Sequence, residues 1–163
     1  MGGEGASSAM VKKLTLLIFA LLSGYVADAL EVGGARVIKV LPHFLDLDGR
    51  HSLYPSLYER DAYQAFLRDH PAQQSGIRFD VQWKARGISS EKLMLRLELR
   101  LSGSDEAKPR VLEKVLKPSR WFSRWSALTL DGEEFKGLGR VTAWRAVLME
   151  EGVVLTELKS FLW

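Results

Sequence analysis

From residue 77 onward, apolar and polar residues alternate with a period of two, the spacing at which successive side chains of a strand point to opposite faces. The clearest example is residues 93–101, where leucine occupies every second position. Leucine favours helices, but a helix would spread these leucines around its whole surface, so the pattern outweighs the propensity. Residues 77–85 alternate in the same way. We therefore predict two strands, joined as a hairpin through residues 87–90.

Charges on the polar face of this predicted hairpin suggest its register. Placing Asp80 opposite Arg96 also places Arg78 opposite Glu98, whereas a slide by two residues in either direction sets like charges opposite one another. Each such ion pair is worth only ~0.2–1 kcal/mol. We therefore expect the buried leucine face, and not the ion pairs, to hold the strands together.

A second hairpin is predicted at the end of the chain, where residues 141–149 and 153–162 flank Glu150-Glu151-Gly152. We expect a three-residue loop whose final glycine adopts a left-handed conformation. In the register that this loop imposes, Arg145 faces Glu157, and we interpret the two as a structural ion pair. Both faces of the hairpin are largely apolar, so we expect it to be central, covered by another element, or part of an interface.

The first part of the chain predicts one helix, over residues 57–69. Ser56 and Glu59 have the spacing of a capping box, in which the serine hydroxyl accepts a hydrogen bond from the amide at Glu59, and Pro71 stops the helix. The face expected to pack on the sheet contains the residues Tyr58, Ala62, Ala65, Phe66 and Asp69.

Further strands are predicted over residues 35–41, 110–116 and 120–130, with tight turns at Asp48-Gly49 and Asp131-Gly132. About seven strands in ~130 residues favour an all-β fold. We predict an antiparallel β-sandwich of immunoglobulin- or fibronectin-like architecture, with one short helix. We expect residues 30–163 to form it as a single domain.

The first 29 residues have the order of a secretory signal peptide. Lys12 and Lys13 precede the apolar run 14–22, and Ala27-Asp28-Ala29 supplies the small residues that signal peptidase accepts. We predict that residues 1–29 are a leader, with Met10 as an alternative start. A retained anchor is the other interpretation, but the apolar run is about half of the ~20 residues that span a bilayer.

Composition changes this picture in two ways. The chain has no cysteine, so in an oxidising compartment the fold must hold by packing without disulfides. A formal net charge of +3 gives only weak long-range fields, so nothing in it calls for a nucleic-acid partner. We expect a periplasmic or secreted protein whose mature form is not embedded in a membrane.

Metal-ligand residue types gather at one place, where His43, Asp46, Asp48 and His51 follow the first predicted strand. Two imidazoles and two carboxylates could hold a divalent ion. Along an extended strand, however, His43 and Asp46 point to opposite faces, and Asp48 is better explained by the turn. We therefore predict no metal site and no cofactor.

Catalytic patterns are weak. The sequence has no cysteine and no Gly-x-Ser-x-Gly turn, and Ser52 is merely adjacent to His51. Glu133 and Glu134 are consecutive acids of the kind that solvent usually surrounds. We predict that the chain is not an enzyme.

Arginines and aromatic residues occur together in one short segment, at Arg120, Trp121, Phe122, Arg124 and Trp125. Such residues can stack on sugar rings or peptides and grip carboxylates, which makes this segment a candidate binding surface. The competing interpretation, which we favour, is that Trp121 and Trp125 fill the core between the sheets while the arginines reach water.

These observations favour an exported, non-enzymatic β-sandwich that serves as a binding or structural module of the cell envelope, with a protein or an envelope glycan as its partner. The oligomeric state is left open by the sequence. The first alternative is a small outer-membrane β-barrel, because the terminal Phe161-Leu162-Trp163 resembles the assembly signal of such barrels. The second is an exported hydrolase, which would need a concave pocket holding His51 beside a carboxylate.

Overall fold

The computed structural model describes residues 34–88, 92–102, 109–117, 122–137 and 139–163. The predicted leader, residues 1–29, and the alternative start at Met10 lie outside these ranges. Within them, no helix has the length and apolar character needed to cross a membrane.

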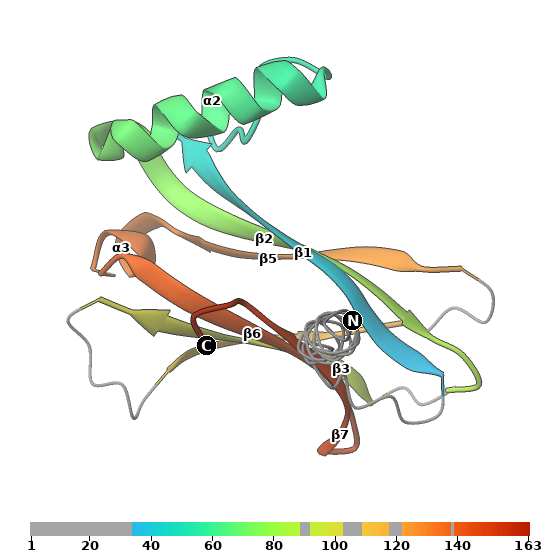
Figure 1. The fold of residues 1–163 in the computed structure, drawn as a ribbon. Coiled ribbons are helices and arrows are strands. Elements are labelled where there is room, and N and C mark those ends of the chain that lie inside the picture. The colour runs from blue at the N-terminus through green and yellow to red at the C-terminus, as the bar shows by residue number, and fades with distance from the viewer. Residues whose placement is uncertain (1–33, 89–91, 103–108, 118–121, 138) are drawn as a thin grey trace, which may run out of the picture.

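The described residues form a mostly β structure with two antiparallel sheets, as the alternating pattern predicted (Figure 1). Sheet A has the strand order β1-β2-β5 and sheet B the order β4-β3-β6-β7. The strands are β1 (Ala35–Asp46), β2 (Gln74–Ala85), β3 (Leu93–Leu101), β4 (Arg110–Val115), β5 (Arg124–Asp131), β6 (Val141–Glu150) and β7 (Val153–Lys159). The helices are α2 (Leu57–Asp69), the short 3-10 helix Pro71–Gln73, and α3 (Gly132–Lys136).

The two sheets enclose one apolar core. From sheet B, Leu95, Leu97 and Leu99 of β3 are fully buried, and from sheet A so are Phe79 and Val81 of β2. These residues belong to a single cluster to which both sheets contribute. The run of alternating leucines is thus a strand whose apolar face turns toward the opposite sheet, which is the stabilising contact expected for two packed sheets.

The predicted hairpin between residues 77–85 and 93–101 is wrong. β2 pairs with β1 and β5, whereas β3 pairs with β4 and β6, so the two strands lie in different sheets. Asp80 therefore does not face Arg96: Arg78 binds Asp80 on its own strand, and Arg96 binds Glu113 of β4. The apolar faces of β2 and β3 both belong to the common core, and their burial there is worth far more than the exposed ion pairs that suggested the register.

The Arg78–Glu98 pairing is wrong for the same reason. Glu98 is buried and pairs with Arg145 of β6, with 2.8 Å between Arg145 Nη2 and Glu98 Oε2. Arg145 also lies 3.6 Å from Glu157, so the ion pair expected in the last hairpin is present. The register predicted for it is wrong, because Arg145 lies opposite Lys159 and Glu157 lies opposite Val147.

The last hairpin, β6 with β7, forms as predicted, but its loop is shorter. Glu150 pairs with Val153, so Glu151 and Gly152 alone make the turn, with φ of 52° and 88°. Two successive residues with positive φ are typical of the turn whose twist matches that of the flanking strands. The predicted left-handed Gly152 is therefore confirmed, and Glu151 shares its conformation.

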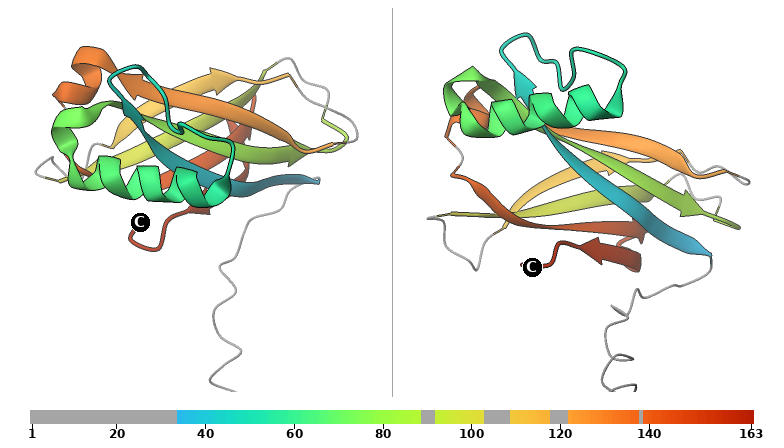
Figure 2. Two further views of the ribbon diagram at one scale, coloured as in Figure 1. Left: turned by 90° about the horizontal axis from the view of Figure 1, so that it is seen from above. Right: turned by 45° about the horizontal axis from the view of Figure 1, so that its top comes forward.

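The helix also forms at the predicted residues, with the Ser56 side chain accepting a hydrogen bond from the Glu59 amide. Its predicted packing face is wrong. Tyr58 is 84% exposed, and the buried residues of α2 are Gln64 and Leu67. The aromatic residues suggested a stripe by their hydrophobicity, whereas the helix is attached through a buried polar residue, and Figure 2 shows it beside sheet A on the side away from sheet B.

Candidate functional site

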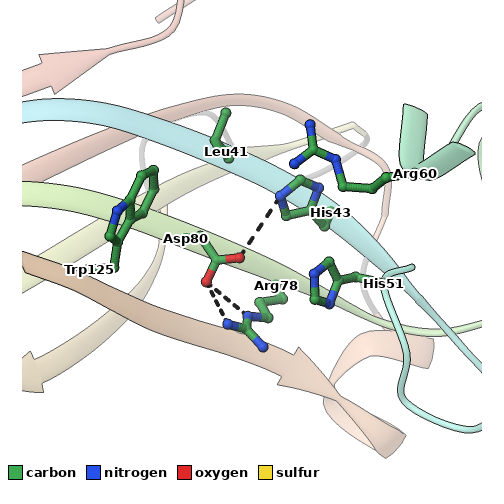
Figure 3. Close-up of a pocket in the computed structure, with 7 residues that line it drawn as sticks. All are labelled: Leu41, His43, His51, Arg60, Arg78, Asp80 and Trp125. Carbon is green, nitrogen blue, oxygen red and sulfur yellow. Dashed lines mark hydrogen bonds and ion pairs between the residues drawn. The ribbon is translucent and has the colours of Figure 1, made fainter. Parts of the chain in front are cut away.

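A hollow of about 290 Å³ lies on the outer face of sheet A, the face turned away from the core. Its lining residues come from β1, β2, β5, α2 and the segment between β1 and α2, and they are Leu41, His43, His51, Arg60, Arg78, Asp80 and Trp125 (Figure 3). Trp125 stands at one side, Arg60 and His51 at the other, and His43 and Asp80 lie between them.

The register of sheet A brings the strand residues together. Leu41 pairs with Asp80 and His43 pairs with Arg78 across β1 and β2, and Trp125 of β5 pairs with Gln82 of β2. In a strand, every second side chain shares a face. The outward positions of three neighbouring strands thereby form the floor of the hollow.

Two anchors hold the remaining wall in place. The amide of Gln64 in α2 accepts a hydrogen bond from the Phe44 N–H at 2.7 Å and donates to the carbonyls of Phe44 at 2.9 Å and His51 at 2.8 Å. Gln64 thus gives β1 at Phe44 the bonds that a further strand would supply, and it ties the His51 segment to the helix. This attachment places Arg60, one turn earlier in α2, over the hollow.

The second anchor is the Asp46 carboxylate at the end of β1. It accepts hydrogen bonds from the Tyr63 hydroxyl at 2.7 Å, from Arg50 Nε at 3.0 Å and from the backbone amides of Asp48 and Arg50. Burial alone would raise the pKa of Asp46, but the bonds from Tyr63 and Arg50 outweigh it and lower this pKa to about 2. The carboxylate is therefore ionised and fixes the turn that leads to His51.

Each of the two arginines that line the hollow pairs with a carboxylate. Arg78 donates from Nε and Nη2 to one oxygen of Asp80, at 2.9 and 2.8 Å, and His43 Nε2 lies 3.8 Å from the other. Arg60 binds Asp61, whose side chain is 70% exposed and lies outside the lining. Among the lining residues two arginines therefore stand against one carboxylate, and the partner of Arg60 lies outside the hollow in solvent.

The two histidines lie side by side, with 5.3 Å between the ring centroids of His43 and His51. Burial lowers the pKa of His43; Asp80 opposes this, whereas His51, Arg60 and Arg78 add to it. His43 is therefore mainly neutral at pH 7. It gains a proton less readily than a free histidine, and an anion seated in the hollow would oppose that tendency.

The residues considered as metal ligands separate into two groups. His43 and His51 line the hollow, whereas Asp46 is held by Tyr63 and Arg50, and Asp48 binds Arg50 at the surface. Among the described residues, no three His, Asp or Glu side chains converge as a metal site would require. The turn at Asp48-Gly49 forms as expected, with a φ of 76° at the glycine.

The predicted binding segment is only partly described, because Arg120 and Trp121 lie outside the described residues. Phe122 is 76% exposed and Arg124 is exposed. The favoured placement of Trp125 in the core is wrong: it is 51% exposed and lines the hollow, because the inward position of this part of β5 belongs to Ser126, which accepts a hydrogen bond from the buried Trp83 indole.

Sequence reasoning missed Arg78 and Asp80 as members of one site because it paired β2 with β3, and it missed Arg60 because it expected α2 to pack through its aromatic residues. The available signal was a set of polar residues at the outward positions of β2, which a pairing of β1 with β2 would have set beside His43.

Chemically, this arrangement can bind an anion through guanidinium and imidazole N–H groups and can stack a ring against the indole. Its lining contains no serine, threonine or cysteine that could act as a nucleophile. Comparisons with models of protein families, with curated proteins and with solved structures found no match to this chain.

Proposed function

We propose that this chain is an exported, non-enzymatic binding module of the cell envelope and that the hollow on sheet A holds its ligand. The observation that carries the proposal is the convergence of Arg60, Arg78, His43 and His51 beside the exposed indole of Trp125. Guanidinium groups with an aromatic face are typical of recognition surfaces, where arginine and tryptophan contribute most of the binding energy. The partner is a protein or an envelope glycan that presents an anionic group.

The proposal includes an immunoglobulin- or fibronectin-like sandwich delivered outside the cytoplasm. Its architecture is supported by two antiparallel sheets with a common core, and its export by the order of charges, apolar residues and alanines in residues 1–29. A cysteine-free fold that depends on packing suits a compartment in which free thiols would oxidise.

The test is cell fractionation combined with site-specific crosslinking. A tagged full chain carries a photo-reactive amino acid in place of Thr129, which is exposed on β5 and lies opposite Arg78 of β2. We expect release with the periplasmic or secreted fraction and a crosslinked partner that is lost in the double variant Arg60→Ala, Trp125→Ala.

The matched control is Arg110→Ala, which removes an arginine that pairs with Glu134 and lies outside the hollow. The control should keep the crosslink. Retention of the chain in the cytoplasm, or a crosslink that survives the double variant unchanged, would contradict the proposal.

A hydrolase is the second candidate, because the hollow does place His51 in a concave site together with Asp80 and His43. A neutral His43 paired with a carboxylate has the arrangement of a general base. Fluorogenic ester, glycoside and phosphodiester substrates test this reading. Turnover abolished by His43→Gln and unaffected by Arg110→Ala would favour the hydrolase over the binding module.

A further inference from the structure

We infer that the ligand of the hollow is an anionic sugar, meaning a sugar ring that carries a carboxylate or a phosphate group. This inference rests on the proposed function, since it names the ligand class of the same hollow. Three independent features carry it: the polarity of the lining, the exchangeable cation at Arg60, and the size of the space.

The lining is polar around a single aromatic face. Only Leu41 and Trp125 are apolar among the residues that line the hollow. Pockets for apolar small molecules are lined predominantly by hydrophobic side chains, so this hollow offers such a ligand too little apolar surface. A sugar ring matches it better, because its C–H face can lie on the indole while its hydroxyl edge meets arginine, histidine and aspartate groups.

The two arginines of the hollow differ in how readily each can give up its carboxylate partner. Arg78 holds a lining carboxylate that is largely shielded, with the Asp80 side chain 16% exposed. Arg60 instead holds Asp61, which is 70% exposed, and exposed ion pairs contribute little. Arg60 can therefore exchange Asp61 for a ligand oxygen at small cost, and its planar guanidinium suits both carboxylate and phosphate.

The size of the hollow sets the third limit. Its volume of about 290 Å³ lies just below the ~300–1,000 Å³ usual for small-molecule pockets, so it suits a single ring better than several. Trp125 is 51% exposed. A sugar ring stacked on this indole would leave the adjoining rings of a glycan in solvent. The hollow could therefore bind a ring within a longer glycan as well as a free sugar.

The experiment is an NMR titration of the full chain in which the indole N–H signal of Trp125 is followed, with Trp125→Phe to assign the signal. The probes are glucuronate, glucose 6-phosphate, glucose and acetate, all at matched ionic strength and pH. We expect saturable shifts with one or both anionic sugars and none with glucose or acetate. The comparison between glucuronate and glucose 6-phosphate tells whether carboxylate or phosphate is the preferred anion.

Substitutions then locate the site. Arg60→Ala should weaken binding of the anionic sugar by about tenfold or more, as expected for loss of hydrogen bonds to a charged group. The affinity of Arg60→Lys should lie between those of the wild type and Arg60→Ala, because lysine keeps the positive charge but lacks the planar, two-pronged guanidinium. Arg110→Ala, the control, should bind as the wild type does.

Three results would overturn the inference. If glucose bound as tightly as glucuronate, the ligand would not need an anionic group. If acetate shifted the indole signal to the same extent, the ligand would not need a sugar ring. If no probe gave a saturable shift, anionic sugars would not be the ligand class. In the last case a crosslinked partner that still depends on Arg60 and Trp125 leaves the proposed function standing, so the two failures are distinguishable.

Discussion

Replacing Gln64 with leucine tests whether one buried amide attaches α2 to sheet A. Leucine has a similar size but makes none of the three hydrogen bonds that Gln64 forms with Phe44 and His51. Each such bond is worth about 1 kcal/mol net, and leaving the Phe44 N–H without its acceptor adds a desolvation cost. Some of this loss is offset by burial of the apolar side chain. We expect the free energy of unfolding to fall by about 2–4 kcal/mol.

Urea denaturation followed by tryptophan fluorescence measures this change, and hydrogen exchange locates it. Amides of α2 should lose more protection than those of β3, because the bonds removed join the helix to the edge of β1. Gln73→Leu is the matched control, since Gln73 is exposed in the short helix after α2.

Gln64→Glu adds a pH test of the same contact. Its ionised carboxylate can accept from the Phe44 N–H but would face the carbonyls of Phe44 and His51, so its loss of stability relative to the wild type should be larger at pH 7 than at pH 4. A loss below about 0.5 kcal/mol in Gln64→Leu, the size typical of surface substitutions, would refute the proposed role of Gln64.

Three further predictions concern buried polar groups. Asp46→Asn should lower the free energy of unfolding by about 2 kcal/mol at neutral pH, because the folded pKa of Asp46, about 2, lies below the ordinary 3.8. In an acid titration the wild type should lose this stability as the pH falls from about 4 to 2, and the variant should not. His43 has a folded pKa below 6.5, so the folded state binds this proton less readily than the unfolded state does. Urea midpoints should therefore show stability falling as the pH drops below about 6.5 in the wild type but not in His43→Gln. Thr156→Val should raise the free energy of unfolding by about 1 kcal/mol in calorimetry, because the Thr156 hydroxyl is fully buried with no hydrogen-bond partner among the described residues.

The strands could be predicted from the sequence because alternation is a local property. Residues 93–101 and 141–149 show the period of two within a few residues, and turn chemistry at Gly152 joins the last two strands directly. The pairing of the strands could not be predicted in the same way. β2 and β5 lie far apart along the chain, and neither carries a local mark that excludes pairing with β3. The ion pairs that suggested the wrong register are too weak to select a partner.

The candidate site was harder still, since it depends on that pairing. Trp125 was singled out by its arginine and aromatic neighbours, but its even spacing suggested the core, and only the register with Gln82 shows that it faces outward. Arg60 reaches the hollow because Gln64 is buried, and a buried glutamine in a helix with exposed aromatic residues runs against the hydrophobic pattern. Buried polar anchors of this kind are visible only when their partners are placed.

The order in which the strands alternate between the sheets determines when the core can close. β2 is followed in the chain by β3 of the other sheet, and β5 by β6, so each sheet receives its last strands late. A nascent chain that ends before residue 124 has the leucines of β3 but lacks both the neighbouring β6 and the third strand of sheet A. Such an intermediate exposes an apolar surface that is prone to aggregation. Folding that requires contacts between distant segments is also slow, on the order of milliseconds to seconds. This polypeptide should therefore depend on chaperones until its last strands have joined, more than a protein built from sequential hairpins would.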